Sequence, residues 1–456
     1  MRAAGRVRRM VGTVIVAATI AAVSACASPA PPAVPQSTGT PIPVPADSAA
    51  VGLPKDMYLH LGAPTEWWWN IGTLRAGDRE FGFEINAAAF PINGWAFTQV
   101  MLTDVQNGKH YQATTVYLPP KSWDPQHWAE SHPTKDWFAR LGDSASQLGS
   151  IVVTDPGTGY TSAPKVTIRG GGGSGASAIA TLGTDGGVGV VLVSDPGTGY
   201  TSTPEITISG DGTGAKAVAA PSYVSMSAPG DDPTQGLHIE AVMADEATLT
   251  PVQFDLTETQ QGSPFTVWGT GVNSTDHALD LQHKNYYFSL THLQTTGTIT
   301  LDGEKIPVTG ETWMDHEYGA FGDSADPVKW NLTDQQLDNG WTLQNYFLSK
   351  AGEDPPTDVA VPSFSTVQSP DGQMYYVAST MTPLAPTWTS QVTGETYYTG
   401  VRVQIPLFDA DFTVTAPVAD QEFPTQGAPV YEGIGSVDGT FQGEHVTGDG
   451  WIEQAH

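Results

Sequence analysis

The 456-residue sequence contains one cysteine, Cys26, and only 19 lysine and arginine residues against 48 aspartate and glutamate residues. A single cysteine excludes an intramolecular disulfide and argues against a thiolate metal site. The formal net charge of −29 repels phosphate backbones, so nucleic acid is an unfavourable partner. The sequence also lacks a convincing nucleotide-binding loop and the paired histidine spacing of common metal sites. We therefore expect no cofactor and no metal.

Long apolar runs are scarce too, whereas glycine and proline are abundant, with 50 and 35 residues. Thr, Val, Tyr and Trp recur in short stretches between turn residues, and this pattern favours strands over helices. Short strands separated by Gly, Pro and Asp suit antiparallel barrels better than α/β folds with crossover helices. We predict an all-β protein, and the length indicates more than one domain.

The N-terminal residues have the pattern of a bacterial export signal. The cationic stretch MRAAGRVRRM precedes VGTVIVAATIAAV, an apolar stretch that is too short for a membrane-spanning helix. Small residues then precede Cys26, as in the lipobox of lipoproteins, although an ordinary cleaved signal stays open. We predict a signal over 1–26 with lipidation at Cys26, and a Pro-rich tether over 27–55. The protein would be exported and lipid-anchored to the outer face of the bacterial cell membrane, with no other membrane contact.

A repeat interrupts the middle of the chain. DPGTGYTSAPKVTI at 155–168 recurs as DPGTGYTSTPEITI at 195–208, and each copy combines a Gly-rich turn with a short β-branched strand. We predict a two-copy β-repeat insert over 148–222, which could contact another protein or a surface. Its Asp- and Gly-rich turns could hold Ca²⁺, but solvated turns are the commoner role of such residues.

Two sets of predicted strands flank this insert. The first set begins with EWWWNIGTL at 66–74 and continues after the insert. The second begins with NYYFSLTHL at 285–293 and includes GETWMDHEYG at 310–319. We predict an N-terminal barrel over 56–284, interrupted by the insert, and a C-terminal barrel over 285–456.

The segment ETWMDHEYG at 311–319 concentrates acidic, aromatic and histidine side chains in a chain with 15% charged residues. If it is a strand, Trp313, Asp315 and Glu317 share one face. A carboxyl group among indole rings inside a barrel would lose its hydration, so its pKa would rise and it could stay protonated near neutral pH. Such an acid can protonate a carbon–carbon double bond, and facing aromatic rings would stabilise the resulting cation.

Four motifs, in this order, resemble the tandem lipocalin-like family of carotenoid 1,2-hydratase (hydroxyneurosporene synthase), also called AttH/CrtC-like. They are TEWWWNIGTL, NYYFS, VTGETWMDHEYG and NGWTLQ. The resemblance covers nearly all of the chain outside the signal, the tether and the insert. It implies two packed lipocalin-like barrels and a hydrophobic ligand, and it places Asp315 where the family motif has its acid.

Two functions follow as hypotheses. The first is an enzyme that transforms an isoprenoid-, lipid- or polyketide-like molecule by acid catalysis, as a hydratase-like hydro-lyase or an isomerase or cyclase, with hydrolysis less favoured. The second is a non-catalytic carrier with the same cavity. The candidate catalytic residues are Asp315, Glu317 and Glu66. The candidate binding residues are Trp67, Trp68, Trp69, Glu84, Tyr286, Tyr287, Trp313, His316 and Tyr318.

Structural roles for the same residues also stay open. The three consecutive tryptophans could close one end of a barrel, as a tryptophan does in ordinary lipocalins. Asp315, His316 and Glu317 could form a buried hydrogen-bond and ion-pair cluster that joins the two barrels. A metal site is less favoured for these three, because adjacent residues on a strand point to opposite faces.

Overall fold

The computed structural model describes residues 35–130, 138–142, 146–183, 185–321, 328–350, 356–425 and 429–455. The predicted signal with Cys26 and the start of the tether lie outside these residues. Within the described ranges, no helix is both long and apolar enough to span a bilayer.

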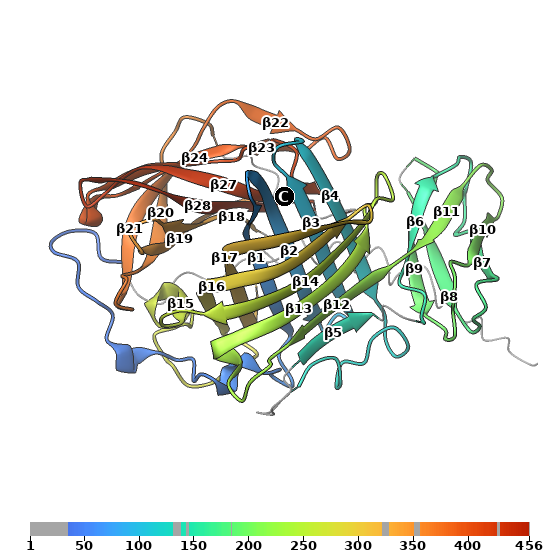
Figure 1. The fold of residues 1–456 in the computed structure, drawn as a ribbon, viewed down its shortest axis with the longest axis horizontal. Coiled ribbons are helices and arrows are strands. Elements are labelled where there is room, and N and C mark those ends of the chain that lie inside the picture. Colours follow the sequence, from blue (N-terminus) through green and yellow to red (C-terminus); the bar gives the residue numbers. More distant parts are fainter. Residues whose placement is uncertain are drawn as a thin grey trace, which may run out of the picture.

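The prediction of an all-β fold with two barrels and an inserted β-repeat unit is confirmed (Figure 1). In the described part of the chain, most residues belong to antiparallel strands, which are rich in β-branched and aromatic side chains. The helical elements among these residues are short 3-10 turns: η2 (Ala46–Ser48), η3 (Lys55–Met57), η4 (Pro233–Gln235), η5 (Val267–Gly269) and η6 (Pro406–Phe408).

The first barrel is a nearly closed antiparallel sheet. Short β15 (Phe265–Thr266) pairs with it as an extra strand. In the order of the sheet, its strands are β4 (Lys109–Tyr117), β3 (Trp95–Asp104), β2 (Arg79–Phe90), β1 (Thr65–Ala76), β17 (Glu304–Gly319), β16 (Asn285–Leu301), β14 (Pro251–Gln260), β13 (Gly236–Ala244), β12 (Ser222–Ser227) and β5 (Phe138–Gly142).

The predicted boundary between the barrels is wrong. Residues 285–319 form β16 and β17, which belong to the first sheet, and residues 309–319 of β17 pair with residues 65–75 of β1. This pairing joins strands far apart in the sequence, so no local pattern reveals it. The second sheet begins only at Val328.

The second barrel closes because β25 pairs with both β24 and β27. Its strands, in the order of the sheet, are β25 (Ala410–Thr415), β24 (Gly400–Ile405), β21 (Met374–Pro383), β20 (Val361–Gln368), β19 (Thr342–Lys350), β18 (Val328–Leu337), β28 (Glu444–Ala455) and β27 (Val430–Phe441). Short β26 (Glu422–Phe423) pairs with β27, and β22 (Thr387–Thr389) forms a hairpin with β23 (Thr396–Tyr398).

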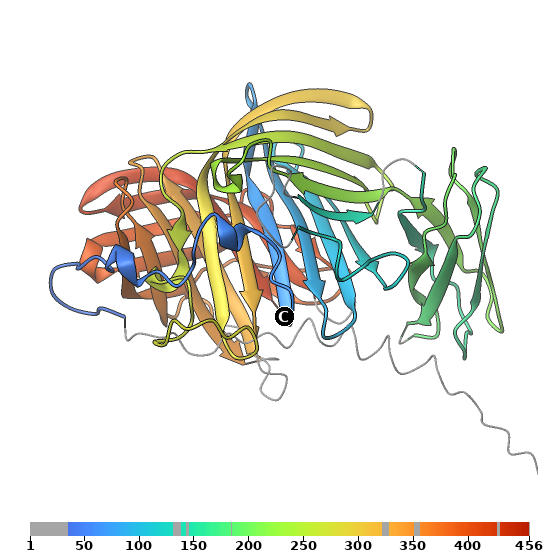
Figure 2. The same cartoon turned by 90° about the horizontal axis from the view of Figure 1, so that it is seen from below.

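The insert leaves the first barrel after β5 and returns at β12, two strands that pair with each other. It lies at the edge of the first barrel, next to β4 (Figures 1 and 2). Its strands are β6 (Ser150–Asp155), β7 (Lys165–Arg169), β8 (Ser177–Leu182), β9 (Val188–Asp195), β10 (Glu205–Ser209) and β11 (Lys216–Ala220). They form a four-stranded sheet, β11-β6-β9-β8, and a two-stranded sheet, β10-β7, around a small core.

Side chains fill the interiors of both barrels. Trp68, Phe83 and Phe288 belong to the core of the first barrel, and Phe347 and Phe412 belong to the core of the second. The barrels therefore contact each other through their outer faces. A Cβ atom on Gly82 of β2 would lie 2.7 Å from Cβ of Ile434 of β27, so this close approach of the sheets requires glycine.

Candidate functional site

The paired strands β1 and β17 place the predicted site residues on two opposite faces. Trp67 lies across from Glu317, Trp69 from Asp315 and Ile71 from Trp313. Because cross-strand partners share a face, these side chains lie together on the outer face of the first barrel, toward the second. The expectation that Asp315 faces a barrel interior is therefore wrong.

A cavity of about 850 Å³ lies against this outer face. One wall comes from the first barrel and the opposite wall from β18, β19 and β28 of the second. The cavity continues over β3 and β4 to the insert. Aromatic rings make up much of the wall between the barrels, including those of Trp67, Trp69, Trp95, Tyr287, Trp330 and Trp451.

Asp315 opens onto this cavity but is only 6% exposed. Its Oδ1 accepts hydrogen bonds from Ser289 Oγ at 2.5 Å and from Trp313 Nε1 at 2.7 Å. Burial raises the pKa of Asp315 to about 6, although these hydrogen bonds act in the opposite direction. Asp315 is therefore an acid that can hold a proton close to neutral pH.

Two further carboxyl groups line the same cavity near Asp315. Glu317 accepts a hydrogen bond from Asn285, and Glu453 of β28 accepts one from the indole of Trp330. Burial raises the pKa of Glu453 to about 7, against the hydrogen bond from Trp330. Burial also raises the pKa of Glu317 well above its usual range, and repulsion from Asp315 adds to this effect.

Glu453 was missed by the sequence reasoning. The signal for it is the segment Trp451-Ile452-Glu453, which repeats the Trp-x-acid spacing of Trp313 and Asp315. On a strand, this spacing places the indole beside the carboxyl group on one face. The last strand therefore showed the same local spacing, but in the structure the indole of Trp451 donates to Glu432, and the hydrogen bond to Glu453 comes from Trp330.

More buried carboxyl groups lie behind the cavity wall. Glu84, Asp334 and Glu432 do not line the cavity, and burial raises the pKa of each well above its usual range. Both carboxyl oxygens of Asp334 and one each of Glu84 and Glu432 have no hydrogen-bond partner among the described residues. Glu84 was predicted to bind substrate; instead it hydrogen-bonds to Asn86 at 3.1 Å and adds negative charge next to the site if it ionises.

The other face of β1 and β17 lies inside the first barrel. Glu66, Trp68, His316 and Tyr318 point there, and so does Tyr286 of β16. None of these five predicted site residues lines the cavity. The physical reason is strand alternation: each immediate neighbour of Trp67, Asp315, Glu317 or Tyr287 must point to the opposite face.

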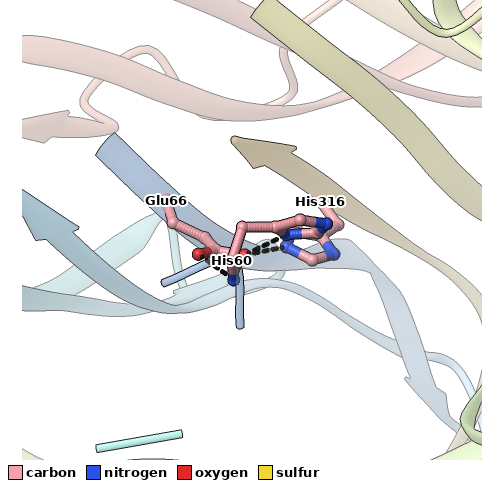
Figure 3. A group of neighbouring side chains, drawn as sticks. All are labelled: His60, Glu66 and His316. Atoms are coloured by element: carbon pink, nitrogen blue, oxygen red, sulfur yellow. Dashed lines mark hydrogen bonds and ion pairs between the residues drawn. The ribbon is translucent and has the colours of Figure 1, made fainter. Parts of the chain in front are cut away.

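Glu66 contacts two histidine rings, those of His60 and His316, in this inner cluster (Figure 3). Its Oε1 is 2.9 Å from His60 Nδ1 and 3.0 Å from His316 Nε2, and its Oε2 accepts the backbone N–H of His60 at 2.8 Å. Trp68 stacks on His316, and Tyr318 stacks on His60 with ring centroids 3.6 Å apart. His60 lies in the segment before β1 and was not singled out from the sequence.

Among the described residues, this cluster is the group whose ligand atoms lie close enough for one metal ion, within 4.8 Å of one another. Burial would lower the pKa of His60, but the negative charges and hydrogen bonds of Glu66 and Asp56 raise it to about 9. The two carboxylates and two histidines thus form an ion-paired, hydrogen-bonded network that fixes the segment around His60 to the barrel.

The fold and the cavity define a protein of two packed lipocalin-like barrels with a chamber between them. The chain belongs to the AttH-like family, whose model matches residues 224–455, and the predicted family is thereby confirmed. A protein assigned as AttH from Nitrosomonas europaea is similar in structure, with a TM-score of 0.54 and 19% identity over 91% of this chain and 98% of that chain.

A second similar structure is kievitone hydratase from Nectria haematococca, with a TM-score of 0.54 and 15% identity. The match covers 94% of this chain and 98% of that chain. At these identities, the likeness to both structures establishes the shared fold. No curated protein matches the chain significantly.

Proposed function

We propose that this protein binds an unsaturated hydrophobic molecule between its barrels and transforms it by acid catalysis, with Asp315 as the proton donor. The observation that carries the proposal is a buried carboxyl group, with its pKa raised to about 6, that opens onto a cavity with aromatic walls. The name of the structurally similar kievitone hydratase agrees with hydration as one such reaction.

The first step is a proton transfer to the ligand. The π electrons of a carbon–carbon double bond form a new C–H bond with the proton of Asp315, which becomes a carboxylate. The hydrogen bonds from Ser289 and Trp313 stabilise this carboxylate. The neighbouring carbon becomes a cation, and the faces of Trp67 and Trp69 stabilise its charge.

The second step determines the product. In a hydration, a water oxygen bonds to the cationic carbon, and the Asp315 carboxylate accepts the proton that the water loses, which restores the acid. In an isomerisation, an adjacent carbon loses a proton to the same carboxylate instead. In a cyclisation, a second double bond attacks the cation, and the new cation then loses a proton to that carboxylate. Glu317, which is next to Asp315 on the same face, serves as a second acid or as a positioning group.

We also propose that the protein acts outside the cytoplasm as a lipoprotein anchored through Cys26. Support comes from the cationic and apolar stretches and from the small residues before this cysteine. A lipid anchor would hold the cavity near a membrane, where hydrophobic molecules are concentrated. Metabolic labelling with a palmitate analogue, compared between wild type and Cys26→Ser, tests this anchor.

The catalytic proposal is tested with farnesol, lycopene and 4-prenylphenol as probes in ¹⁸O-labelled water. Wild-type protein should convert at least one of them to an ¹⁸O-containing alcohol or to an isomer of equal mass, as followed by liquid chromatography and mass spectrometry. Asp315→Asn should retain the probe without converting it. Asp302→Asn is the matched control, because Asp302 lies in the exposed turn of the same hairpin.

Two results would contradict the catalytic proposal. If wild type retains the probes unchanged, the protein is a carrier of hydrophobic molecules. If Asp315→Asn converts a probe as fast as wild type does, another group is the acid.

A further inference from the structure

The four-stranded sheet of the insert is apolar on both faces. One face carries Ile151, Val191 and Val193, which belong to the insert's own core. The other face carries Ile179 and Leu192, which are cross-strand partners. A small antiparallel sheet with one solvated face normally has polar side chains there, so an apolar second face indicates that something covers it.

This second face is part of the wall of the cavity that contains Asp315. Val152, Ile179 and Leu192 all line it, although Ile179 is 45% exposed. Val392, from the turn between β22 and β23, lines the same cavity and is 77% exposed. Large apolar side chains that are exposed beside a cavity become buried if a ligand occupies it.

Specific contacts hold the insert in this position. Ser122 Oγ donates a hydrogen bond to the carbonyl oxygen of Val193 at 2.8 Å. Val152 packs with Ala220 and with Ala244 of β13 in a separate apolar cluster. The insert is therefore docked against the first barrel, and its apolar face keeps a defined place in the cavity wall.

The two ends of the cavity differ in chemistry. Around Asp315 the wall carries the indole rings of Trp67 and Trp69, whereas the insert contributes the aliphatic side chains of Ile179 and Leu192. Indole faces suit a π system or a developing cation, and branched aliphatic side chains suit a saturated chain. A ligand that covers both ends must be elongated and must have two chemically different parts.

We infer that the ligand has an unsaturated or aromatic head next to Asp315 and an aliphatic tail that lies against the insert. The insert is then a specificity element that selects for tail length. This inference deepens the proposed function and rests on it, because it assumes that a hydrophobic molecule occupies the cavity between the barrels.

The test measures the binding of 4-butylphenol, 4-octylphenol and 4-decylphenol to the full-length protein by isothermal titration calorimetry. Each methylene that the insert buries should tighten binding to wild type by about fourfold. Leu192→Asp and Ile179→Asp should abolish the gain for the long tails and leave the affinity for 4-butylphenol within about twofold. The control is Thr207→Asp, at an exposed position of β10 in the two-stranded sheet of the insert. This variant should behave like wild type.

The outcomes separate the inference from the function on which it rests. If wild type binds 4-butylphenol and gains nothing from a longer tail, or if Leu192→Asp retains the whole gain, the inference is wrong and the proposed function stands. If wild type binds none of the phenols, both are overturned. Circular dichroism and thermal melting of each variant exclude unfolding as the cause of lost binding.

Discussion

The two faces of the β1–β17 pair carry similar residues but opposite electrostatics. Glu66 on the inner face and Asp315 on the outer face are both buried, at 1% and 6% exposure. Burial acts to raise both pKa values, yet the charge of His60 and the hydrogen bonds from His316 and His60 keep the pKa of Glu66 below its usual range. The hydrogen bonds that lower the pKa of Asp315 come from the neutral side chains of Ser289, Trp313 and Tyr287, so burial dominates.

The comparison shows that the partner of a buried acid, more than its depth, determines whether it keeps its proton. On the inner face, a histidine that binds a proton makes the acid an anion and makes the cluster structural. On the outer face, neighbouring carboxyl groups such as Glu453 make a second negative charge unfavourable. That face therefore holds protons next to a cavity, as a reactive site requires.

The largest effect should come from removing the acidic proton of Asp315, which lies on the outer face. Asp315→Asn should lower kcat on any probe that wild type converts by about 10²- to 10⁴-fold, because a general acid contributes that much. The amide is nearly isosteric with the protonated acid, so the melting temperature should change little. If Asp315→Asn instead unfolds at room temperature, Asp315 has a structural role, as Glu66 does.

Glu66→Gln should show the reverse pattern. Removing the negative charge leaves buried His60 with Asp56, 3.6 Å away, but without Glu66, which should cost up to about 3 kcal/mol of unfolding free energy. Turnover per folded molecule should stay within severalfold of wild type, because Glu66 does not line the cavity. Urea denaturation and a rate measurement, with Glu240→Gln on an exposed position of β13 as control, check both statements.

The titratable groups on the two faces should also stabilise the folded state in different pH ranges. The pKa of Asp315 is raised from 3.8 to about 6 and that of Glu453 from 4.5 to about 7, so the folded state holds protons that the unfolded state loses. Their stabilisation is complete below about pH 4 and disappears as pH rises through 7. The pKa of His60 is raised from 6.5 to about 9, so its stabilisation is lost between those values.

Denaturation curves from pH 4 to pH 10 test this separation. Asp315→Asn should reduce the loss of stability in the lower window only, where Glu453 still titrates, and Glu66→Gln should reduce it in the upper window only, where Asp56 still raises the pKa of His60. Stability that rises with pH in either window would contradict the assigned proton positions.

The smallest effect should come from a single hydrogen bond on the outer face. Trp313→Phe removes the indole N–H that stabilises the ionised form of Asp315, so the pKa of Asp315 should rise by about one unit. In wild type, kcat should fall as pH rises above about 6, and in this variant the fall should begin about one unit higher. An unshifted profile would mean that Asp315 does not control the rate.

Much of this organisation is readable from the sequence. Alternation along 66–71 and 311–318 indicates that Trp313, Asp315 and Glu317 share a face, and the motifs identify the family. Sequence reasoning could not tell which side of the sheet is the barrel interior, because both faces of this strand pair are rich in aromatic residues. It therefore grouped Glu66 and His316 with a site from which they point away.

Other parts of the site depend on contacts that no segment encodes locally. Glu453 lies on the last strand and reaches Asp315 only because the outer faces of the two barrels pack together. His60 lies before β1 and meets His316 only because β17 pairs with β1. The insert was predicted as a separate unit, but its place in the cavity wall follows from how it docks beside β4.

The sequence by itself determined the high content of β-strands, the alternation of side chains along each strand and the pairing of Trp313 with Asp315 at i and i+2. Each of these depends on local backbone geometry. Only the tertiary structure decided which face became an ion-paired core and which became a cavity with protonated acids. The reason is that a buried carboxyl group takes its charge state from neighbours on other strands, and long-range packing places those neighbours.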